Sequence, residues 1–480
     1  MSPPRQRLLA MLVDGARPDV MSAMADAGEL PTFKKHFIDR GGFRPATSVF
    51  PTVSGPAHLP LLTGMHPGQA NLPGIRWAER PTGLRGNFLF RTRSYMAPFR
   101  ASKLARDIPD HITTLFDHVP GTADVNTWFV RGCPGRARFT RFSKAAAFVR
   151  SLATRDWYSS DLQAENAVLR AWDRGFPSVS SVFPAVDELG HRFGPTTNES
   201  YEAYRRFDVI LGRIVDALVK RGVYDQTLIC ITSDHGQTAT HTHVDIDDIV
   251  AQVYPKTLAY PKLWRHLFNA EAAAMVSGNS LANIYVMGEK SWQHRPDFET
   301  PSGRASELLA VLIAHPAVAH VIYRRDEKVY VVANARGNLV IDARTVADDG
   351  VVRFQTHGIN PLGGTMPERA TRDEILRTTF ESDHPDGPWQ VVEFFQSARA
   401  GDIVVCAHPG FDLRSRFEYQ PHNGSHGCLD REHMMVPAAV NGRWQGDHLT
   451  ALDIFPSMLS AMGLPIPEGR SGRVVPIAED

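Results

Sequence analysis

Short apolar runs alternate along this chain with longer segments in which apolar side chains recur at helical spacing. Residues 7–13, 178–186 and 227–232 are apolar, or alternate apolar with small polar residues, as strands buried in a sheet do. Residues 198–221 carry apolar side chains three or four positions apart, which predicts an amphipathic helix packed against that sheet. The alternation predicts an α/β fold with a largely parallel central sheet.

The same rhythm continues at both ends of the chain, but the middle differs. Further helices are expected at 18–28, 30–42, 55–63 and 450–462, and further strands at 46–50, 122–130, 402–407 and 434–440. Between about 238 and 399, helical pieces mix with short strands and an acidic polar run. We therefore expect a catalytic core formed by residues 1–237 and 400–480. We expect an irregular excursion within it at about 77–105, and an inserted cap or substrate lobe at 238–399.

The composition narrows the class of protein. At 480 residues, with 43% hydrophobic and 22% charged side chains, the chain is globular and has room for a large core. Lys+Arg and Asp+Glu are both 52, so nothing favours nucleic-acid or anionic-membrane binding. The apolar run at 8–13 is too short for a signal sequence, and no segment is apolar for long enough to span a bilayer. We expect a cytoplasmic protein without a membrane or nucleic-acid partner; the sequence does not indicate its oligomeric state.

Three predicted strands run into aspartates: Val13-Asp14, Val186-Asp187 and Ser233-Asp234. The carboxyl ends of parallel strands lie at one edge of a sheet, which is where such folds bind ligands. Three carboxylates gathered there would repel one another and raise each other's pKa unless a cation lay between them. The pattern therefore predicts a divalent metal site at this edge.

Histidines accompany these carboxylates. His191 comes four residues after Asp187, His235 directly follows Asp234, and His426 lies in a separate loop. Carboxylate and imidazole ligands together suit Zn²⁺, at about 2.0–2.2 Å, with manganese or iron as alternatives. Seven or so ligands of this kind are too many for one tetrahedral ion, but they suit two ions about 4 Å apart.

A hydroxyl group in the stretch 52–58 supplies the remaining element of this chemistry. Ser54 lies in a Pro/Gly-rich bend directly before a run that can begin a helix. A serine hydroxyl is a weak nucleophile until its pKa is lowered, and coordination to a metal lowers it. We therefore take Ser54 to be both a candidate nucleophile and a candidate metal ligand.

Six motifs occur in the order found in the alkaline phosphatase superfamily, and they most resemble its type I phosphodiesterase/nucleotide pyrophosphatase branch. They are Asp14-Gly15, Pro51-Thr52-Val53-Ser54-Gly55-Pro56-Ala57-His58, Leu62-Thr63-Gly64, Asp187-x-x-Gly190-His191-x-x-Gly194-Pro195, Ser233-Asp234-His235-Gly236 and Gly424-Ser425-His426-Gly427. The resemblance covers both ends and the middle of the chain and misses the inserted lobe. It implies an alkaline-phosphatase-like three-layer sandwich with a largely parallel central sheet.

The resemblance also implies a function and a division of the ligands. One metal ion would be held by Asp14, Ser54, Asp234 and His235, and the other by Asp187, His191 and His426. Ser54 would attack a small phosphorylated substrate and form a covalent phospho-enzyme that is then hydrolysed. The implied activity is that of a phosphodiesterase or nucleotide pyrophosphatase.

Two departures from the family pattern leave alternatives open. The family more often has Thr at the position of Ser54, and Thr52 is a second candidate for the nucleophile. The phosphodiesterase branch has an Asn about twenty residues after the nucleophile, where this chain has Ile75. Arg76 or Asn71 could replace that donor to the substrate phosphate. A phosphomonoesterase or a phosphonate hydrolase of the same superfamily therefore remains an alternative.

Several other polar residues have ordinary structural explanations. We expect His58 to bond backbone in the bend, His241 and His243 to pack or face solvent, and His422 to be either a support for the metal ligands or a surface residue. The arginines at 91, 93 and 100 are interpreted as a solvated basic face rather than a phosphate pocket. A metal-binding protein that recognises a phosphorylated partner without turning it over is the non-enzyme alternative.

Overall fold

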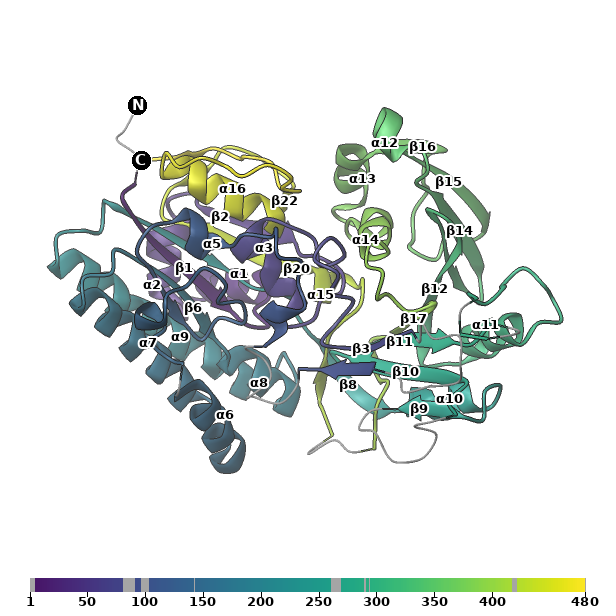
Figure 1. The fold of residues 1–480 in the computed structure, drawn as a ribbon. Helices are drawn as coiled ribbons and strands as arrows, with labels where there is room; N and C mark the ends of the chain where they lie inside the picture. The colour runs from purple at the N-terminus through teal and green to yellow at the C-terminus, as the bar shows by residue number, and fades with distance from the viewer. Residues whose placement is uncertain are drawn as a thin grey trace.

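Two bodies of secondary structure lie side by side in Figure 1: a core, drawn in purple, blue and yellow, and a lobe, drawn mostly in green. This computed structural model describes residues 5–80, 91–95, 103–141, 143–259, 269–288, 291–292, 294–416 and 421–479. Arg100 and most of the excursion predicted at 77–105 lie outside these residues. Both ends of the described chain belong to the core (Figure 1).

The core is built on a seven-stranded sheet. Its spatial order is β22 (Leu449–Thr450), β2 (Phe43–Thr47), β20 (Met435–Val440), β7 (Thr227–Thr232), β1 (Arg7–Val13), β6 (Ser178–Phe183) and β5 (Thr122–Val125). The central strand β1 pairs in parallel with β6 and β7, and β5 continues this pairing, whereas β20 runs antiparallel to both of its neighbours. The predicted α/β fold with a largely parallel central sheet is confirmed.

Helices cover both faces of this sheet, because alternate residues of β1 point to opposite sides. Leu9, Met11 and Val13 pack into one apolar cluster with side chains of the helices α1 (Pro18–Asp26), α7 (Tyr158–Asp173) and α9 (Asn198–Lys220). On the other face, Leu8 and the side chains that alternate with it pack with the helices α3 (Leu59–Thr63), α5 (Leu115–His118) and α16 (Ala451–Ala461). The result is a three-layer sandwich whose central strand is sealed from water.

The lobe is built on a nine-stranded sheet. Its order is β16 (Arg369–Thr371), β15 (Val351–Gly358), β14 (Gly337–Asp342), β13 (Val329–Asn334), β12 (Val318–Asp326), β17 (Ile403–Ala407), β11 (Leu281–Val286), β10 (Ala272–Ser277) and β9 (Thr257–Ala259). Its helices are α10 (Ile246–Ala251), α11 (Arg304–Ala314), α12 (Val346–Asp349), α13 (Arg372–Thr379) and α14 (Gly387–Phe394). The strand predicted at 402–407 lies here as β17, between β11 and β12, and not in the core sheet. We propose a lobe that consists of residues 238–399 together with β17.

Small sheets and helices complete the described chain. They are the sheet of β18 (Gly410–Asp412), β8 (Thr238–His243) and β19 (Gly424–Ser425), the pairs β21 (Arg443–Trp444) with β23 (Ile477–Ala478) and β3 (Arg76–Glu79) with β4 (Arg91–Ser94), and the helices α2 (Pro31–Phe33), α6 (Ser143–Thr154), α8 (Ala185–Phe193) and α15 (Arg431–Met434). Within the described part of the chain, every helix is too short or too polar to cross a bilayer.

Some predicted boundaries were wrong. The strand predicted at 178–186 ends at Phe183, and Pro184 leads directly into α8. The strand predicted at 46–50 lies at Phe43–Thr47, and the helix predicted at 30–42 is the short α2 followed by a π-helical turn, Lys34–Ile38. The helix predicted at 55–63 begins as a 3₁₀ turn, Pro56–His58, before α3.

Candidate active site

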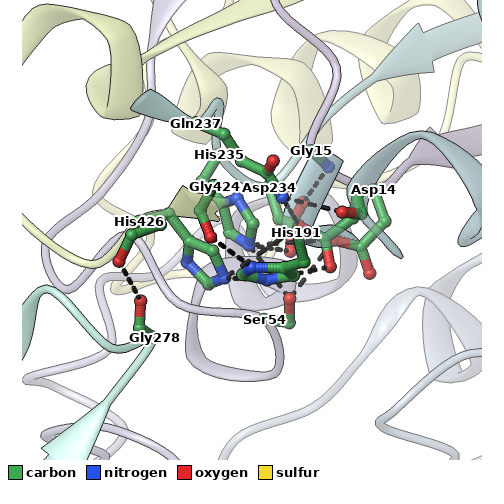
Figure 2. A network of polar contacts seen from close by, with 12 residues as sticks. Asp14, Gly15, Ser54, His191, Asp234, His235, Gln237, Gly278, Gly424 and His426 are labelled. Carbon is green, nitrogen blue, oxygen red and sulfur yellow. Dashed lines mark hydrogen bonds and ion pairs between the residues drawn. The ribbon is translucent and has the colours of Figure 1, made fainter. Parts of the chain in front are cut away.

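Ser54 lies at the carboxyl edge of the core sheet, in the loop between β2 and the 3₁₀ turn. Its Oγ is 3.2 Å from Asp14 Oδ1 and 2.9 Å from His235 Nε2 (Figure 2). The next residue, Gly55, has a φ of 93°, and a Cβ there would meet Leu104 and Trp128 at about 3 Å. A glycine is therefore needed to bring Ser54 up to the strand ends. Ser54 is half-buried and is therefore more accessible than Asp14, Asp234 and His235, which are buried.

Asp14 and Asp234 follow the strands β1 and β7, as the pattern predicted, and both are buried. The Gly15 N–H donates to Asp234 Oδ1 at 3.3 Å, which ties the two strand ends together. Burial, and then the charges of Asp234 and Asp187, raise the pKa of Asp14 well above its usual value. Burial also opposes ionisation of Asp234, but His235 and His58 outweigh it and lower the pKa of that carboxyl. Two carboxylates this close cannot both be charged at low cost without a cation.

His235 completes the first group of ligands. Its Nε2 lies 3.3 Å from Asp234 Oδ2 and 3.7 Å from Asp14 Oδ1. Its Nδ1 lies 3.1 Å from the Gly236 carbonyl, which assigns the ring proton to Nδ1 and leaves a lone pair on Nε2. We call Asp14, Ser54, Asp234 and His235 the Ser54 cluster.

Asp187 and His191 begin a second group, on one face of α8. They are four residues apart in this helix, so the side chains stand one above the other, with Asp187 Oδ2 3.5 Å from His191 Nε2. His426 comes from the loop after β19, and its Nε2 lies 3.2 Å from His191 Nε2 and 4.0 Å from Asp187 Oδ1. We call Asp187, His191 and His426 the His191 cluster.

The positions of the ring protons of the two histidines make the His191 cluster suitable for a cation. His191 Nδ1 donates to the Gly424 carbonyl at 2.7 Å, and His426 Nδ1 donates to the Thr52 carbonyl at 2.8 Å. Each Nε2 then carries a lone pair, and the two lone pairs face each other beside a carboxylate. Burial, and then His235 and His191, lower the pKa of His426 well below its usual value, so it does not take up a proton to relieve this contact. The donor set fits a divalent metal.

The two clusters adjoin each other. The rings of His235 and His426 stack, with their centroids 3.6 Å apart and an interplanar angle of 13°. Gly15 lies at the same junction, where a Cβ would come within 2.8 Å of the Asp187 backbone. The structure thus brings all seven predicted ligands into one region and sorts them into the two predicted groups. Figure 2 labels all of them except Asp187.

The other predicted site residues lie elsewhere or have other partners. Thr52 is buried and its Oγ donates to the Cys428 carbonyl at 2.7 Å. The Asn71 amide oxygen accepts from Ser397 and from the Arg399 backbone. Arg76 is buried at the start of β3, where its guanidinium donates to the Val276 carbonyl at 3.1 Å. A role for Arg76 in substrate binding stays a prediction.

The structure contradicts the prediction for His58 and favours one of the two alternatives for His422. His58 was expected to bond backbone, but it is fully buried and its Nε2 lies 3.2 Å from Asp234 Oδ2, because the 3₁₀ turn directs it towards the strand ends. His422 packs its ring 4.7 Å from that of His191 and contacts the Asn279 amide, so it lies half-buried behind a predicted metal ligand and is not an exposed surface residue. Burial, and then the cationic groups around it, lower the pKa of His422 to about 2.

Sequence patterns did not reveal several residues that build the site. Gln237, next to the Ser233–Gly236 motif, contacts Asp187. The turn between β10 and β11 in the lobe brackets His426, because the Gly278 carbonyl accepts from the His426 N–H and the His426 carbonyl accepts from the Ser280 N–H, both at 3.1 Å. Adjacency to a motif was the only signal for Gln237, and the lobe turn carried none.

A third group of metal-type side chains lies close by, at Cys428, Asp430 and His433. Its cysteine and histidine atoms are already engaged: the Cys428 thiol with the Ser280 carbonyl, His433 Nε2 with Thr238 Oγ1 at 2.9 Å, and His433 Nδ1 with the Cys428 N–H at 3.3 Å. We interpret this third group as structural.

A three-layer α/β sandwich with two adjoining carboxylate and imidazole clusters at its sheet edge defines a member of the alkaline phosphatase superfamily. The family model of type I phosphodiesterase / nucleotide pyrophosphatase matches residues 8–429, and the chain belongs to this family. The family predicted from the motifs is confirmed.

Solved structures share the fold over nearly the whole chain. Phosphonoacetate hydrolase from Sinorhizobium meliloti 1021, in complex with phosphonoacetate, is 18% identical with a TM-score of 0.56, and the match covers 96% of each chain. The same enzyme in complex with phosphonoformate gives a TM-score of 0.55. Murine ectonucleotide pyrophosphatase / phosphodiesterase 5 is 15% identical with a TM-score of 0.53, over 97% of this chain and 98% of that one. The likeness at these identities is one of fold.

Curated relatives match over short segments only. Ectonucleotide pyrophosphatase/phosphodiesterase family member 7 of Homo sapiens is 30% identical over 81 residues, which is 16% of this chain and 18% of that protein. The uncharacterized pyrophosphatase/phosphodiesterase C725.05c of Schizosaccharomyces pombe is 35% identical over 57 residues, 12% of either chain. The chain therefore matches less than a fifth of the length of each relative.

Proposed function

We propose that this protein is a metal-dependent hydrolase of phosphate esters that uses two divalent metal ions and Ser54 as its nucleophile. Its activity is that of a phosphodiesterase or nucleotide pyrophosphatase, acting on a small phosphorylated substrate. The observation that carries this proposal is the position of Ser54 Oγ, within 3.2 Å of Asp14 and His235 and beside a second cluster of metal-type side chains. The family of the chain supports the same class of reaction.

The Ser54 cluster would hold one metal ion and the His191 cluster the other. When bound, the two ions supply positive charge for the serine oxygen and for the phosphoryl oxygens of the substrate. Zn²⁺ suits the mixed carboxylate and imidazole ligands best, and manganese or iron are alternatives. Crowding of Asp14 with Asp234, and the facing lone pairs of His191 and His426, are the two features that favour cations here.

Ser54 is placed to attack a phosphorus atom. Its Oγ would form a bond to phosphorus while the bond from phosphorus to the leaving-group oxygen breaks, and water would then cleave the phosphoserine ester to regenerate the hydroxyl. Before attack, the hydroxyl proton lies between His235 Nε2 and Asp14 Oδ1, the two acceptors within reach. Packing of Gly55 against Trp128 and Leu104 holds the loop in this position.

The contacts of Thr52 favour Ser54 over Thr52 as the nucleophile. The Thr52 hydroxyl is fully buried and donates to the Cys428 carbonyl, and the Thr52 carbonyl accepts from His426. Thr52 thus ties the nucleophile loop to the loop of His426, and its oxygen is turned away from the Ser54 cluster. Its role in this proposal is to fix the distance between the two clusters.

A rate comparison tests the proposal. Enzyme reconstituted with Zn²⁺ would be assayed on aryl phosphodiesters, phosphomonoesters, phosphonates and sulfates, with Ser54→Ala, Ser54→Thr and Thr52→Val as variants. We expect the phosphodiester to be turned over fastest, Ser54→Ala to be inactive, and Ser54→Thr to retain turnover. Fastest turnover of a monoester or phosphonate would reassign the substrate within the superfamily. Two bound metals without turnover of any phosphate ester would favour the non-enzyme alternative, a protein that recognises a phosphorylated partner.

A further inference from the structure

Gln237 is buried between α8, which carries Asp187 and His191, and β19, whose Gly424 carbonyl accepts from His191. It directly follows the Ser233–Gly236 motif and precedes β8, and the residue is 1% exposed. Arg17 anchors its main chain, since a guanidinium N–H donates to the Gln237 carbonyl at 3.0 Å. The side chain therefore extends from a fixed backbone position, and its amide group contacts Asp187 of α8.

The amide nitrogen of Gln237 holds Asp187 at two points. Nε2 donates to the Asp187 backbone carbonyl at 2.9 Å and also to Asp187 Oδ1. Both partners are acceptors only, so the opposite orientation of the amide would set oxygen against oxygen; this assigns the nitrogen. With Oδ1 engaged by Gln237, the oxygen that faces His191 at 3.5 Å is Oδ2. Gln237 thus determines which carboxylate oxygen Asp187 presents to His191.

Two glycines create the space for this amide. A Cβ on Gly190 would lie 2.1 Å from Gln237 Oε1, and a Cβ on Gly424 would lie 2.9 Å from the same atom. Gly190 is inside α8, where alanine is normally the better helix former by about 1 kcal/mol. Gly424 also supplies the carbonyl that accepts from His191 Nδ1. Both glycines therefore serve the same small region around Asp187 and His191.

We propose that Gln237 is a positioning residue for the metal ion of the His191 cluster, an inference that rests on the proposed two-metal function. Hydrogen bonds that orient a ligating carboxylate typically change metal affinity by about 10–100-fold. Gln237 does not touch the substrate or the metal in this account. Gln237 affects the metal site by orienting Asp187. Gly190 affects it by leaving space for the Gln237 amide group.

The chain offers a matched control for an ordinary buried glutamine. Gln390 is fully buried, its Nε2 donates to Asp386 Oδ2 at 2.8 Å, and its Oε1 accepts from the Phe50 N–H at 2.8 Å. It makes the same type of contact with a carboxylate that belongs to neither cluster. Gln390→Met therefore measures the general cost of replacing a buried glutamine in this fold.

The experiment compares Zn²⁺ affinities of the wild type, Gln237→Met, Gly190→Ala and Gln390→Met by competition with a chelator, together with Co²⁺ absorption spectra. For Gln237→Met we expect one of two Zn²⁺ ions to bind about 10–100-fold more weakly, the other to be unchanged, and the Co²⁺ spectrum of the weakened site to shift. Gly190→Ala should reproduce this result, and it carries the same test if Gln237→Met does not fold. Gln390→Met should leave both affinities unchanged.

The outcomes separate this inference from the proposed function. Unchanged Zn²⁺ affinities in folded Gln237→Met or Gly190→Ala would overturn the role of Gln237, as would an equal loss in Gln390→Met. Failure of the wild type to bind two Zn²⁺ ions would overturn the two-metal function itself, whatever the variants do.

Discussion

The Ser54 cluster and the His191 cluster lie next to each other but differ in their side chains and in the elements that carry them. The Ser54 cluster is rich in carboxylate, with Asp14 and Asp234 buried at the ends of parallel strands. The His191 cluster is rich in imidazole, stands on a helix and a loop, and takes one of its supports from the lobe turn at Gly278. The first is made within the core, by the strand ends and the loops that follow them, whereas the second requires the core and the lobe to meet.

This difference predicts opposite responses to losing the metal. Without a cation the carboxylates of the Ser54 cluster repel one another, and burial together with the charges of Asp234 and Asp187 raises the pKa of Asp14, which favours its protonated form. Without a cation the His191 cluster has facing lone pairs and a histidine, His426, that resists protonation. The Ser54 cluster also carries the proposed nucleophile, so damage to it should cost more activity than damage to its neighbour.

The largest effect is expected from Ser54→Ala. Removing the attacking oxygen should lower turnover of an aryl phosphodiester by on the order of 10⁴-fold or more, as loss of a covalent nucleophile does in other hydrolases. The His191 cluster should keep its metal, because Ser54 is not among its ligands. Steady-state kinetics with metal analysis of the same sample checks both points. Turnover within tenfold of the wild type would remove Ser54 from its role.

His191→Ala should break the second cluster and leave the first intact. We expect one metal ion to be lost and turnover to fall by on the order of 10³-fold, because a bound cation contributes several kcal/mol of charge stabilisation. The phosphoserine step should slow, but the Ser54 cluster should still bind its own ion. Loss of both ions together would contradict two separable sites.

Gly278→Ala tests the contribution of the lobe. Gly278 has a φ of 60°, and a Cβ there would lie 2.7 Å from the His426 carbonyl and 2.9 Å from its Nδ1. We expect His426 to shift and one metal to bind about 10–100-fold more weakly. Gly350→Ala is the control, since Gly350 has a φ of 68° with open space around it. Equal effects of the two substitutions on metal affinity would count against the contact between the lobe and His426.

The pH dependence of the metal-free protein should separate the clusters by sign. The pKa of Asp14 is raised, so its contribution to stability is present below its unfolded value of about 3.9 and is lost as pH rises through the folded pKa. The pKa of His426 is lowered, so its contribution is present above about pH 6.5 and is lost as pH falls, by about 1.4 kcal/mol per pH unit. Thermal unfolding in chelator should therefore show a shallower alkaline slope in Asp14→Asn and a shallower acid slope in His426→Gln than in the wild type. The opposite assignment of slopes to variants would refute the comparison.

Thr52→Val should have the smallest effect on activity. It removes a buried hydrogen bond to the Cys428 carbonyl, which we expect to cost about 1–3 kcal/mol of the free energy of unfolding. Turnover should change by less than about tenfold, since the Ser54 hydroxyl remains. Denaturant unfolding and kinetics on the same variant separate the two quantities. Complete loss of turnover in a folded Thr52→Val protein would reopen Thr52 as the nucleophile.

The sequence predicted the Ser54 cluster better than the His191 cluster, for a physical reason. Asp14 and Asp234 follow apolar runs that are strands in any context, so their place at the sheet edge follows from local pattern. Asp187 was also assigned to a strand end, but Pro184 begins α8, and the carboxylate lies in the first turn of that helix. Asp187 does lie at the predicted edge of the sheet, but it belongs to a helix and not to the predicted strand.

Other features depend on contacts that no local pattern encodes. The strand β17 has the same apolar pattern as the core strands, and only its pairing with β11 and β12 assigns it to the lobe. Gln237 is a polar residue beside a motif. The space for its amide group is left by Gly190 and Gly424, which lie far from it in sequence. The inward position of His58 depends on a 3₁₀ turn where a regular helix was predicted. Long-range packing decides all three.

Anomalous scattering at the zinc edge from crystals of the Zn²⁺-loaded enzyme would locate both proposed metal ions. We predict two peaks per chain, one among Asp14, Ser54, Asp234 and His235 and the other among Asp187, His191 and His426. In His191→Ala crystals the second peak should vanish while the first remains. A single peak, or peaks away from these seven residues, would contradict the account.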